Sequence, residues 1–576
     1  MDLKTRGVPA TDEERAAIEL VLGPAPARDM HDARGGHEFR SRRHLLLPTL
    51  NAVNDRVGWI SQQAIDHIAE RLDASPAEIY GVATFYALFA TEARPPRQVH
   101  VCVDLACRAF GGVTEADLPA DAHPSPCLGM CEQAPAMLVI DSGNPAQRVA
   151  IGGITADQIG AATSGDRIEP PTRSPAEFVP QAGDPDLVLL RRAGSGDPLD
   201  IEAYVEDGGL AALAQAIDFG PAKIIAAVEA SGLLGRGGAA FPTARKWEAV
   251  RTQETMPHHL VCNADESEPG TFKDRTLMEN DPFALLESMI IAAIATGCQY
   301  GWIYLRGEYP SVEATLTSAI ETFRRSGLLG PQKGFDITLV RGAGAYICGE
   351  ETAIFNSIEG YRGEPRNKPP FPFEVGLFGQ PTVVNNVETM MNIPSIMLGR
   401  TESNRRLFCL SGAVVNPGVY EVELGLTLAE LIDMAGGLRD GSQLQAVLLG
   451  GAAGRFVGPD SLDLVLTHEA TRDAGLSLGS GVVMVLDQTV DLVDQVRRIA
   501  AFFRDESCGQ CVPCRVGTVR QEEVIERLAS GIRDGQLELL EDIGKAMTDA
   551  SICGLGQTAH GAIESAIVTL GVFGDD

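Results

Sequence analysis

Eight of the twelve cysteines in this chain fall into two compact groups, and these groups limit what the chain can fold into. They are Cys102, Cys107, Cys127 and Cys131, followed by Cys508, Cys511, Cys514 and Cys553. In a large chain whose N-terminus lacks an apolar signal core, such groups indicate metal or redox centres before disulfides. The other four are scattered and are predicted to be small buried hydrophobic residues: Cys262, Cys298, Cys348 and Cys409.

The second group places three thiolates on one turn, as Cys508-x2-Cys511-x2-Cys514, with a distant fourth ligand at Cys553. A cubane [4Fe–4S] cluster needs four soft ligands around a compact core, and this set supplies them. A structural zinc site uses the same ligands but is usually built from two pairs. The three-plus-one spacing therefore favours the cubane, with zinc as the alternative.

The first group consists of two pairs, Cys102-x4-Cys107 and Cys127-x3-Cys131. One pair per iron suits a rhombic [2Fe–2S] cluster. A zinc knuckle has the same pairwise pattern and stays open as the alternative.

Length and charge exclude several classes of protein. A chain of 576 residues predicts about three to five domains. Lys and Arg total 47 against 78 Asp and Glu, which gives a formal net charge of −31. This balance argues against binding nucleic acid or anionic lipid, because both need a basic face. The longest apolar run, around Met289–Ala295, is too short to span a bilayer. We therefore expect a cytoplasmic protein with no direct membrane insertion.

Composition shifts divide the chain into successive segments. In order, they are an N-terminal arm expected to be mobile (1–42), a helical segment (43–96), a strand-rich segment with the first cysteine group (97–163), a linker rich in Pro, Asp, Ser and Gly (164–200), an α/β segment (201–400), a β-rich segment (401–487) and a helical segment with the second cysteine group (488–576). Ser61 and the capping box Ser75-Pro76-Ala77-Glu78 mark helix starts within the helical segment.

A glycine-rich loop, SGLLGRGGAAFPTARKW, spans 231–247. Gly235, Gly237 and Gly238 allow close approach of a ligand to the backbone, and Arg236 and Lys246 offer positive charge for a phosphate. The loop lacks the ending of a Walker loop and the spacing of a Rossmann loop. Taken alone, it is equally consistent with a tight turn.

An acidic loop, VCNADESEPGTFKDR, follows at 261–275 and contains Asn263, Asp265, Glu266 and Glu268. These acceptors could hold a ribityl chain or ribose hydroxyls, and the alternative is a solvated acidic loop. Three more motifs come next, RGAGAYICGEET at 341–352, NKPPFP at 367–372 and PTVVNNVET at 381–389. Their order is more informative than any one of them.

Taken together, these motifs and ESCGQCVPCRVGT resemble the NADH-binding flavoprotein subunit of respiratory complex I and its relatives. The relatives are the diaphorase subunits of NAD-reducing hydrogenases and of NAD-dependent formate dehydrogenases. The resemblance runs from about Leu189 to Phe573, and residues 43–160 resemble the family's helical bundle and thioredoxin-like [2Fe–2S] protein. In this chain the two are fused.

The resemblance implies a multidomain α/β fold. Its expected domains are a helical bundle (43–96), a thioredoxin-like [2Fe–2S] domain (97–163), an FMN- and NADH-binding domain (201–400), a ubiquitin-like domain of the SLBB type (401–487) and a C-terminal helical [4Fe–4S] domain (488–576). The ubiquitin-like domain is expected to be structural.

The resemblance also implies residue roles. The FMN contacts would be Gly235, Gly237 and Lys246, with Asn263, Asp265, Asn385, Asn386 and Thr389 around its phosphate and ribityl chain. The nicotinamide side would be approached by Glu268 and Tyr346. The dinucleotide pocket would be lined by Gly349, Glu350 and Glu351. The adenine would stack on Phe241 and Phe371, with Lys368 near the pyrophosphate or ribose.

Three departures from the family pattern stand out. Ala249 replaces a phenylalanine that is common in complex I members, which weakens the adenine stack. Ala240 replaces a frequent glycine and restricts the loop. Only 19 residues separate Cys107 from Cys127, so a helix of the thioredoxin-like domain is expected to be shortened or lost.

The expected function is that of a diaphorase. NADH carries two electrons as a hydride, whereas the clusters carry one at a time, and FMN is the converter. No protein residue is expected to act as an acid or base, and Glu350 would act electrostatically. Glu351 near a ribose would repel a 2′-phosphate, which favours NAD over NADP.

The expected partner is a molybdopterin subunit with iron–sulfur clusters, which makes this chain the beta subunit of a soluble NAD-dependent formate dehydrogenase. Three features argue against a complex I subunit: the fusion of the two proteins, Ala240 and Ala249. The alternatives are a NAD-reducing hydrogenase, a complex I input module and, in a different class, a non-enzymatic metal scaffold.

Overall fold

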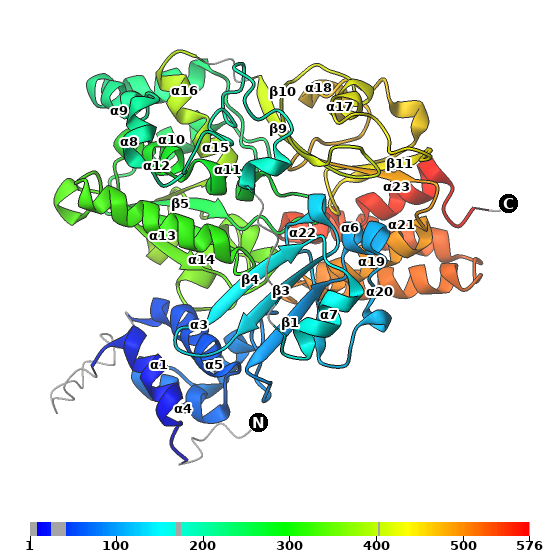
Figure 1. Ribbon diagram of the computed structural model, residues 1–576, viewed down its shortest axis with the longest axis horizontal. Helices are drawn as coiled ribbons and strands as arrows, with labels where there is room; N and C mark the ends of the chain where they lie inside the picture. The colour runs from blue at the N-terminus through cyan, green and yellow to red at the C-terminus, as the bar shows by residue number, and fades with distance from the viewer. Residues whose placement is uncertain (1–7, 25–41, 167, 169–173, 401–403, 575–576) are drawn as a thin grey trace.

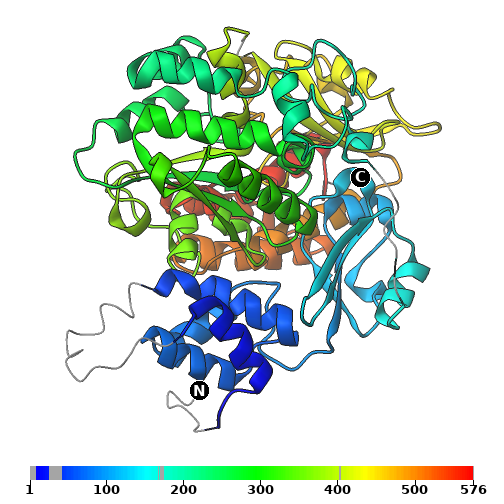
Figure 2. The same ribbon diagram turned by 60° about the vertical axis from the view of Figure 1, so that its left-hand side comes forward.

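The computed structural model describes residues 8–24, 42–166, 168, 174–400 and 404–574 (Figures 1 and 2). The chain forms a multidomain α/β structure, as predicted. Its described residues form three sheets of four, four and five strands. In both views the N-terminal helices lie at one end of the molecule, and the five-stranded sheet lies at the opposite end.

The N-terminal part is a bundle of helices. They are α1 (Asp12–Leu22), α3 (Leu46–Val57), α4 (Gln62–Leu72) and α5 (Pro76–Ala83). The prediction of a mobile arm over 1–42 was wrong for α1, which buries Ala17, Ile18 and Leu22 against the other helices. Thr11 and Glu14 form a capping box that begins this helix. The rest of the predicted arm, 1–7 and 25–41, lies outside the described residues.

The first cysteine group lies on a four-stranded sheet of order β2-β1-β3-β4. Its elements are β1 (Arg97–Cys102), α6 (Leu105–Gly111), β2 (Ala122–Ser125), β3 (Ala136–Asp141), β4 (Gln147–Gly152) and α7 (Ala156–Thr163). β2 runs parallel to β1, and the other pairs are antiparallel. Between Cys107 and Cys127 the chain has only the end of α6, a 3₁₀ turn and β2, which agrees with the predicted shortening.

The central part is a parallel sheet of order β7-β6-β5-β8 with helices around it. Its strands are β5 (His258–Ala264), β6 (Cys298–Leu305), β7 (Asp336–Arg341) and β8 (Thr382–Asn386). Its helices are α8 (Ile201–Glu206), α9 (Ala211–Ala230), α10 (Thr243–Arg251), α11 (Lys273–Asn280), α12 (Pro282–Thr296), α13 (Pro310–Arg325), α14 (Glu351–Ile358), α15 (Val387–Met391) and α16 (Ile393–Met397). The strand order reverses between β5 and β8, and in such sheets ligands bind outside the carboxyl ends of the strands at the reversal.

One helix within the described ranges, α9, has the length and apolar composition of a membrane span. Gly220, with φ of 71°, interrupts it, and Pro221 follows. Neither half therefore reaches the roughly 20 residues that a spanning helix needs. α9 packs on α10, α12 and α16 through one face, which buries Leu213, Ile224 and Val228.

The five-stranded sheet has the order β10-β9-β13-β11-β12. Its elements are β9 (Arg405–Gly412), β10 (Gly418–Glu423), α17 (Leu428–Met434), β11 (Leu444–Leu449), β12 (Arg455–Val457), α18 (His468–Asp473) and β13 (Val482–Asp487). The segment predicted as a linker is tied to this sheet, because the Glu421 carboxylate accepts hydrogen bonds from the backbone N–H groups of Val188, Leu189 and Leu190. Its last part is therefore packed, although it forms no long helix or strand.

The C-terminal part contains the second cysteine group and is helical. The helices are α19 (Leu492–Asp505), α20 (Val512–Ala529), α21 (Gln536–Ala550), α22 (Gly554–Thr558) and α23 (Gly561–Leu570). Cys508 and Cys511 lie in the turn between α19 and α20, and Cys553 directly precedes α22.

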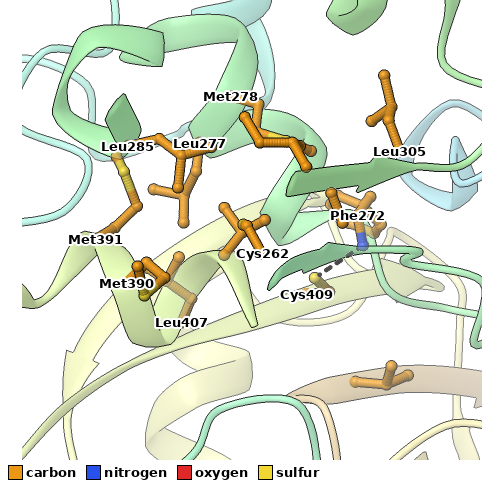
Figure 3. Packing of buried hydrophobic residues seen from close by; sticks show 14 of the residues in the cluster. Cys262, Phe272, Leu277, Met278, Leu285, Leu305, Met390, Met391, Leu407 and Cys409 are labelled. Carbon is orange, nitrogen blue, oxygen red and sulfur yellow. Dashed lines mark hydrogen bonds between the residues drawn. The ribbon is translucent and has the colours of Figure 1, made fainter. Parts of the chain in front are cut away.

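A continuous apolar core joins the central sheet to the five-stranded sheet (Figure 3). Phe272 donates its backbone N–H to Cys409 Sγ at 3.2 Å, which links the loop after β5 to β9. The four scattered cysteines are all buried, as predicted. The core fixes the loops that surround the site described next.

Candidate cofactor site

A cavity of about 950 Å³ opens at the carboxyl ends of β5 and β8. Its lining comes from the glycine loop, α10, the acidic loop, the segments 346–351 and 368–373, β8, the five-stranded sheet and α22. The predicted site residues that line it are Gly235, Gly237, Gly238, Phe241, Lys246, Asn263, Asp265, Glu266, Glu268, Tyr346, Gly349, Glu350, Glu351, Lys368, Phe371, Asn385, Asn386 and Thr389. The structure therefore gathers motifs that lie far apart in the sequence.

The glycine loop packs tightly against β8. A side chain at Gly237 would meet Asn386 Cβ at 3.2 Å, and Gly238 has a φ of 111° that favours glycine. Gly235 donates its N–H to the carbonyl of Phe241 at 2.9 Å and closes the loop. At Gly235, Gly237 and Gly238 the loop therefore presents its backbone to the cavity.

The side chain of Arg236 lies apart from the cavity, in contrast to the predicted phosphate contact. It is buried, is absent from the cavity lining and donates to the carbonyl of Arg405 at 3.0 Å. Burial lowers its pKa, and the Glu388 carboxylate partly opposes this effect. Its backbone N–H donates to Thr389 Oγ1 at 2.8 Å, so the residue anchors the loop.

Two departures from the family pattern border this cavity. Ala240 adopts a φ of 49°, a left-handed conformation in which a Cβ atom is strained. Ala249 lines the cavity with a methyl group where a phenylalanine ring is common. Phe241 and Phe371 line the cavity with 47% and 45% of their surface exposed, so both rings are open to a ligand.

Charges alternate on one wall of the cavity. Lys246 Nζ lies 3.2 Å from Glu351 Oε2, and Lys368 Nζ lies 2.7 Å from Glu351 Oε1. Burial disfavours the Glu351 carboxylate, but the two lysines outweigh it and lower its pKa. Lys368 also contacts Glu350 Oε1 at 2.9 Å, while the other Glu350 oxygen caps α14 through the N–H groups of Thr352 and Ala353. Glu350 is thus fixed in orientation and partly neutralised.

Asn263 and Asp265 occupy the end of β5. Asn263 Nδ2 donates to the Gly349 carbonyl at 2.8 Å, and its Oδ1 accepts from the Asp265 N–H at 3.1 Å. Asp265 Oδ2 is buried with no hydrogen-bond partner among the described residues, and the residue lines the cavity. Burial raises the pKa of Asp265 well above its usual range. A buried acceptor of this kind is suited to a ligand hydroxyl.

Glu266 differs from its predicted ligand role, because its carboxylate is engaged by the protein. It accepts hydrogen bonds from Thr271 Oγ1 and from the backbone N–H groups of Asp274 and Arg275. Tyr309 OH donates to the same carboxylate at 3.1 Å. The side chain therefore orders the start of α11, and burial raises its pKa to about 7.

Glu268 and Tyr346 form a pair inside the cavity. Tyr346 OH donates to Glu268 Oε2 at 2.6 Å, and the Ala453 N–H donates to Oε1 at 2.8 Å. Burial raises the pKa of Glu268 to about 7, although both hydrogen bonds oppose the rise. Glu268 is therefore poised to change charge near neutral pH.

The amides of β8 are held by the protein as well. Trp247 Nε1 donates to Asn385 Oδ1 at 2.8 Å, and Asn386 Nδ2 donates to Asp274 Oδ2 at 2.6 Å. Lys273 Nζ lies 2.7 Å from Asp274 Oδ1 and is fully buried. This network presents β8 rigidly at the cavity floor.

The motifs did not reveal several lining residues. Ser267 and Ser480 line the cavity, and neither buried Oγ has a hydrogen-bond partner within the described ranges. Ala453 and Gly479 reach the cavity from loops that lead into β12 and β13, in the domain that the sequence predicted to be structural. The glycine-rich runs at 450–454 and 479–481 are the only sequence signal for this wall.

The second cysteine group adjoins the cavity. Cys508, Cys514 and Cys553 are buried, and Cys511 is half-buried. Gly554, Leu555 and Thr558 of α22, which follow Cys553 directly, line the cavity. A redox centre on these thiolates would therefore lie beside any ligand in the cavity.

The first cysteine group is fully buried and sits beneath the acidic loop. Cys127 Sγ lies 3.4 Å from Cys131 Sγ, and Cys127 N–H donates to Asp104 Oδ2 at 3.1 Å. Asp104 in turn pairs with Arg498 of α19 at 3.3 Å. These contacts bind the small sheet to the C-terminal helices.

Four family models match successive parts of the chain. The Nuo51 FMN-binding domain matches 228–395, and the iron–sulfur binding region of NADH-ubiquinone oxidoreductase-F matches 494–570. A thioredoxin-like [2Fe–2S] ferredoxin matches 35–114, and an SLBB domain matches 407–454. The F subunit of NADH-quinone oxidoreductase in Aquifex aeolicus is 43% identical over 389 residues, which cover 65% of this chain and 90% of the relative. The chain belongs to the family of NADH-quinone oxidoreductase F subunits.

Relatives of these F subunits extend the comparison. NADP-reducing hydrogenase subunit HndC of Solidesulfovibrio fructosivorans is 38% identical and covers 66% of this chain and 81% of that protein. A crystal structure of NAD⁺-reducing [NiFe]-hydrogenase in the H2-reduced state contains a chain with 31% identity and a TM-score of 0.75, and the match covers 92% of each chain. The predicted family and fold class are confirmed.

Family membership identifies the cofactors as FMN, NAD, a [4Fe–4S] and a [2Fe–2S] cluster, as predicted. The residues present fit these groups. The cysteine sets supply four soft ligands each, and unpaired buried oxygens of Asp265, Ser267 and Ser480 line a cavity of the size of small-molecule sites. The iron–sulfur matches decide against the zinc alternatives.

The site provides binding and electrostatics for an NADH oxidoreductase. When bound, FMN supplies the conversion between two-electron hydride transfer and single-electron transfer. The protein contributes a rigid glycine loop, two lysines and a set of carboxylates in a restricted cavity.

Proposed function

We propose that this chain is the NAD-linked diaphorase subunit of a soluble, cytoplasmic formate dehydrogenase, which oxidises formate to CO2 and passes the electrons to NAD⁺. The observation that carries the diaphorase role is the cavity that contacts the Cys553 turn directly through Gly554 and Leu555. The partner would be a molybdopterin subunit with its own iron–sulfur clusters. The fusion of the [2Fe–2S] domain to the flavoprotein supports a soluble dehydrogenase over complex I, because the match to the NADH-quinone oxidoreductase F subunit covers only 65% of this chain.

A NAD-reducing hydrogenase is the second candidate partner. It is favoured by the solved hydrogenase chain, whose match covers 92% of both proteins and therefore includes the fusion. Both candidates use the same residues in this chain and differ only in the subunit that supplies the electrons.

We further propose the ligand positions within the cavity. FMN would lie against the backbone of the glycine loop and β8, with Asp265, Ser267 and Ser480 offering hydrogen bonds to its hydroxyls. The nicotinamide would approach Glu268 and Tyr346, and the adenine would lie between Phe241 and Phe371. Arg236 and Glu266 would hold the loops of the site in place and would not contact the ligand, because protein groups already engage both side chains.

The partner would dock on the outer face of α20. Val512, Val516 and Val519 are spaced along one face of this helix and are 59%, 47% and 40% exposed. Arg515 is exposed beside them, and within the described residues its side chain bonds only to a backbone carbonyl, that of Gly509, so a carboxylate on the partner would complement this patch. Cys511 of the cluster set directly precedes α20 and is half-buried, which makes this face the short route for electrons to leave.

The experiment is an assay of the native complex, purified anaerobically through a tag on this chain. NAD⁺ reduction is measured with formate and, separately, with hydrogen. Reduction driven by formate supports the first proposal, and reduction driven by hydrogen replaces it with the second. Neither activity, with NADH-to-acceptor turnover retained, would reject both partners.

A further inference from the structure

Arg306 lies between the acidic loop and the first cysteine group. It follows β6 directly, and only 2% of its surface is exposed. Its Nη1 donates to the carbonyl of Glu266 at 2.5 Å, and its Nη2 donates to the carbonyl of Cys127 at 2.5 Å. One guanidinium therefore touches both the cavity loop and a ligand residue of the [2Fe–2S] set.

The guanidinium of Arg306 lies in an environment that nearly excludes water. Its salt bridge within the described residues is to Glu308, at 2.9 Å, and that side chain is also buried. Cys127 is 2% exposed. Because water is largely excluded, the guanidinium charge, which Glu308 offsets only in part, still interacts with any charge on the cluster.

A second arginine holds the same loop in a different way. Arg275 Nε donates to the Gly129 carbonyl at 3.1 Å, and the guanidinium pairs with Glu132 and Glu279. Its contact is with a residue that provides no ligand, and two carboxylates surround its charge. Arg275 is therefore a matched control, since it ties the same loop but makes no hydrogen bond to a cysteine of the ligand set, whereas Arg306 does.

We propose that Arg306 is a positioning residue that raises the reduction potential of the [2Fe–2S] cluster held by Cys102, Cys107, Cys127 and Cys131. On reduction the cluster gains one electron and one unit of negative charge, and the buried guanidinium stabilises that form. Hydrogen bonds and buried charge around the ligands are established means of tuning such clusters. The inference is independent of which partner the chain serves.

The test is a redox titration of the purified, cluster-containing protein in the absence of any partner subunit. Electron paramagnetic resonance measures the reduced cluster at each potential. Arg306→Gln should lower the ratio of reduced to oxidised cluster about tenfold at a fixed potential, which is 59 mV for a one-electron couple. Arg306→Lys keeps the charge and should restore most of the ratio. Arg275→Gln should leave the ratio nearly unchanged.

Glu308→Gln should shift the ratio of reduced to oxidised cluster in the opposite direction. It removes the negative charge that offsets Arg306, so the ratio of reduced cluster should rise. The proposal is overturned if Arg306→Gln and Arg306→Lys shift the ratio equally, or if neither shifts it. If Arg306→Gln fails to assemble the cluster, Glu308→Gln decides: a rise supports the proposal and an unchanged ratio rejects it.

Discussion

Tyr346 links Glu268, which lines the cofactor cavity, to Glu506 of the segment after α19, and both residues are half-buried. Its hydroxyl donates to Glu268 Oε2 at 2.6 Å, and its backbone N–H donates to Glu506 Oε2 at 2.8 Å. Burial raises the pKa of each carboxyl to about 7. A small change of pH near neutrality should therefore change the charge of Glu268, which adjoins the proposed position of the nicotinamide.

The affinity for NADH should fall as the pH rises through about 7. Glu268 is neutral below this pH and ionised above it, and the ionised form repels a dinucleotide that carries two phosphates. The dissociation constant of NADH, measured anaerobically between pH 6 and 8, should therefore increase with pH. Glu268→Gln should flatten the profile.

The hydrogen bond from Tyr346 should set the midpoint of this pH dependence. Because it stabilises the ionised form of Glu268 and so lowers its pKa, Tyr346→Phe should move the midpoint to higher pH. Glu506 has a similar pKa, so Glu506→Gln is the control and should leave the pH dependence that arises from Glu268 in place. Identical profiles in the native protein and in Glu268→Gln would show that Glu268 does not titrate in this range.

Replacing Glu351 should relax the preference for NAD. Its carboxylate is held ionised by Lys246 and Lys368, and a negative charge near the ribose repels a 2′-phosphate. Glu351→Gln should raise the ratio of kcat/KM for NADPH to that for NADH about tenfold, or about 1.4 kcal/mol. Glu359→Gln, which lies outside the cavity lining, is the control and should leave the ratio unchanged.

Replacing Ala240 with glycine should relieve backbone strain and stabilise the protein. Its φ of 49° costs an L-residue roughly 1 kcal/mol relative to glycine. Ala240→Gly should raise the midpoint of thermal unfolding, measured by calorimetry. Ala239→Gly, at a neighbouring residue without a positive φ, should lower it, because glycine there only adds freedom to the unfolded chain. An equal loss in both variants would contradict the strain.

The α20 face should be needed for the partner and not for NADH oxidation. Val516→Asp places a charge in the exposed valine patch and should abolish partner-driven NAD⁺ reduction while NADH-to-acceptor turnover persists. Val568→Asp changes a valine that is 79% exposed on α23 and should leave both activities intact. Loss of both activities in Val516→Asp alone would indicate damage to the cluster set and not to docking.

Spacing predicted the two kinds of iron–sulfur domain that the family models match, because cysteine spacing is a local pattern, and the eight individual ligands stay a prediction. The three-plus-one and two-plus-two patterns needed no tertiary information, and neither did the buried state of Cys262 and Cys409. The helix at Asp12–Leu22 was missed because its apolar face is short and gains its stability from packing on α3 and α4. Its capping box at Thr11 and Glu14 was the available signal.

The sequence did not predict the directions in which the side chains of the site point. Arg236 looked like a phosphate ligand within its motif, but it donates to the Arg405 carbonyl, a contact made by a distant segment. Glu266 looked like a ligand acceptor, but three backbone and side-chain donors of the following turn take its oxygens. The wall formed by Ala453 and Ser480 depends on how the five-stranded sheet docks, which no local pattern reveals.

The most direct test of the diaphorase role is an anaerobic titration of the purified chain with NADH. Flavin absorbance and electron paramagnetic resonance are recorded together. We predict one FMN per chain, bleaching of the flavin by NADH, and the appearance of iron–sulfur signals. Cys514→Ala should retain the bleaching and lose the [4Fe–4S] signal. A colourless protein with stoichiometric zinc and no oxidation of NADH would contradict this role.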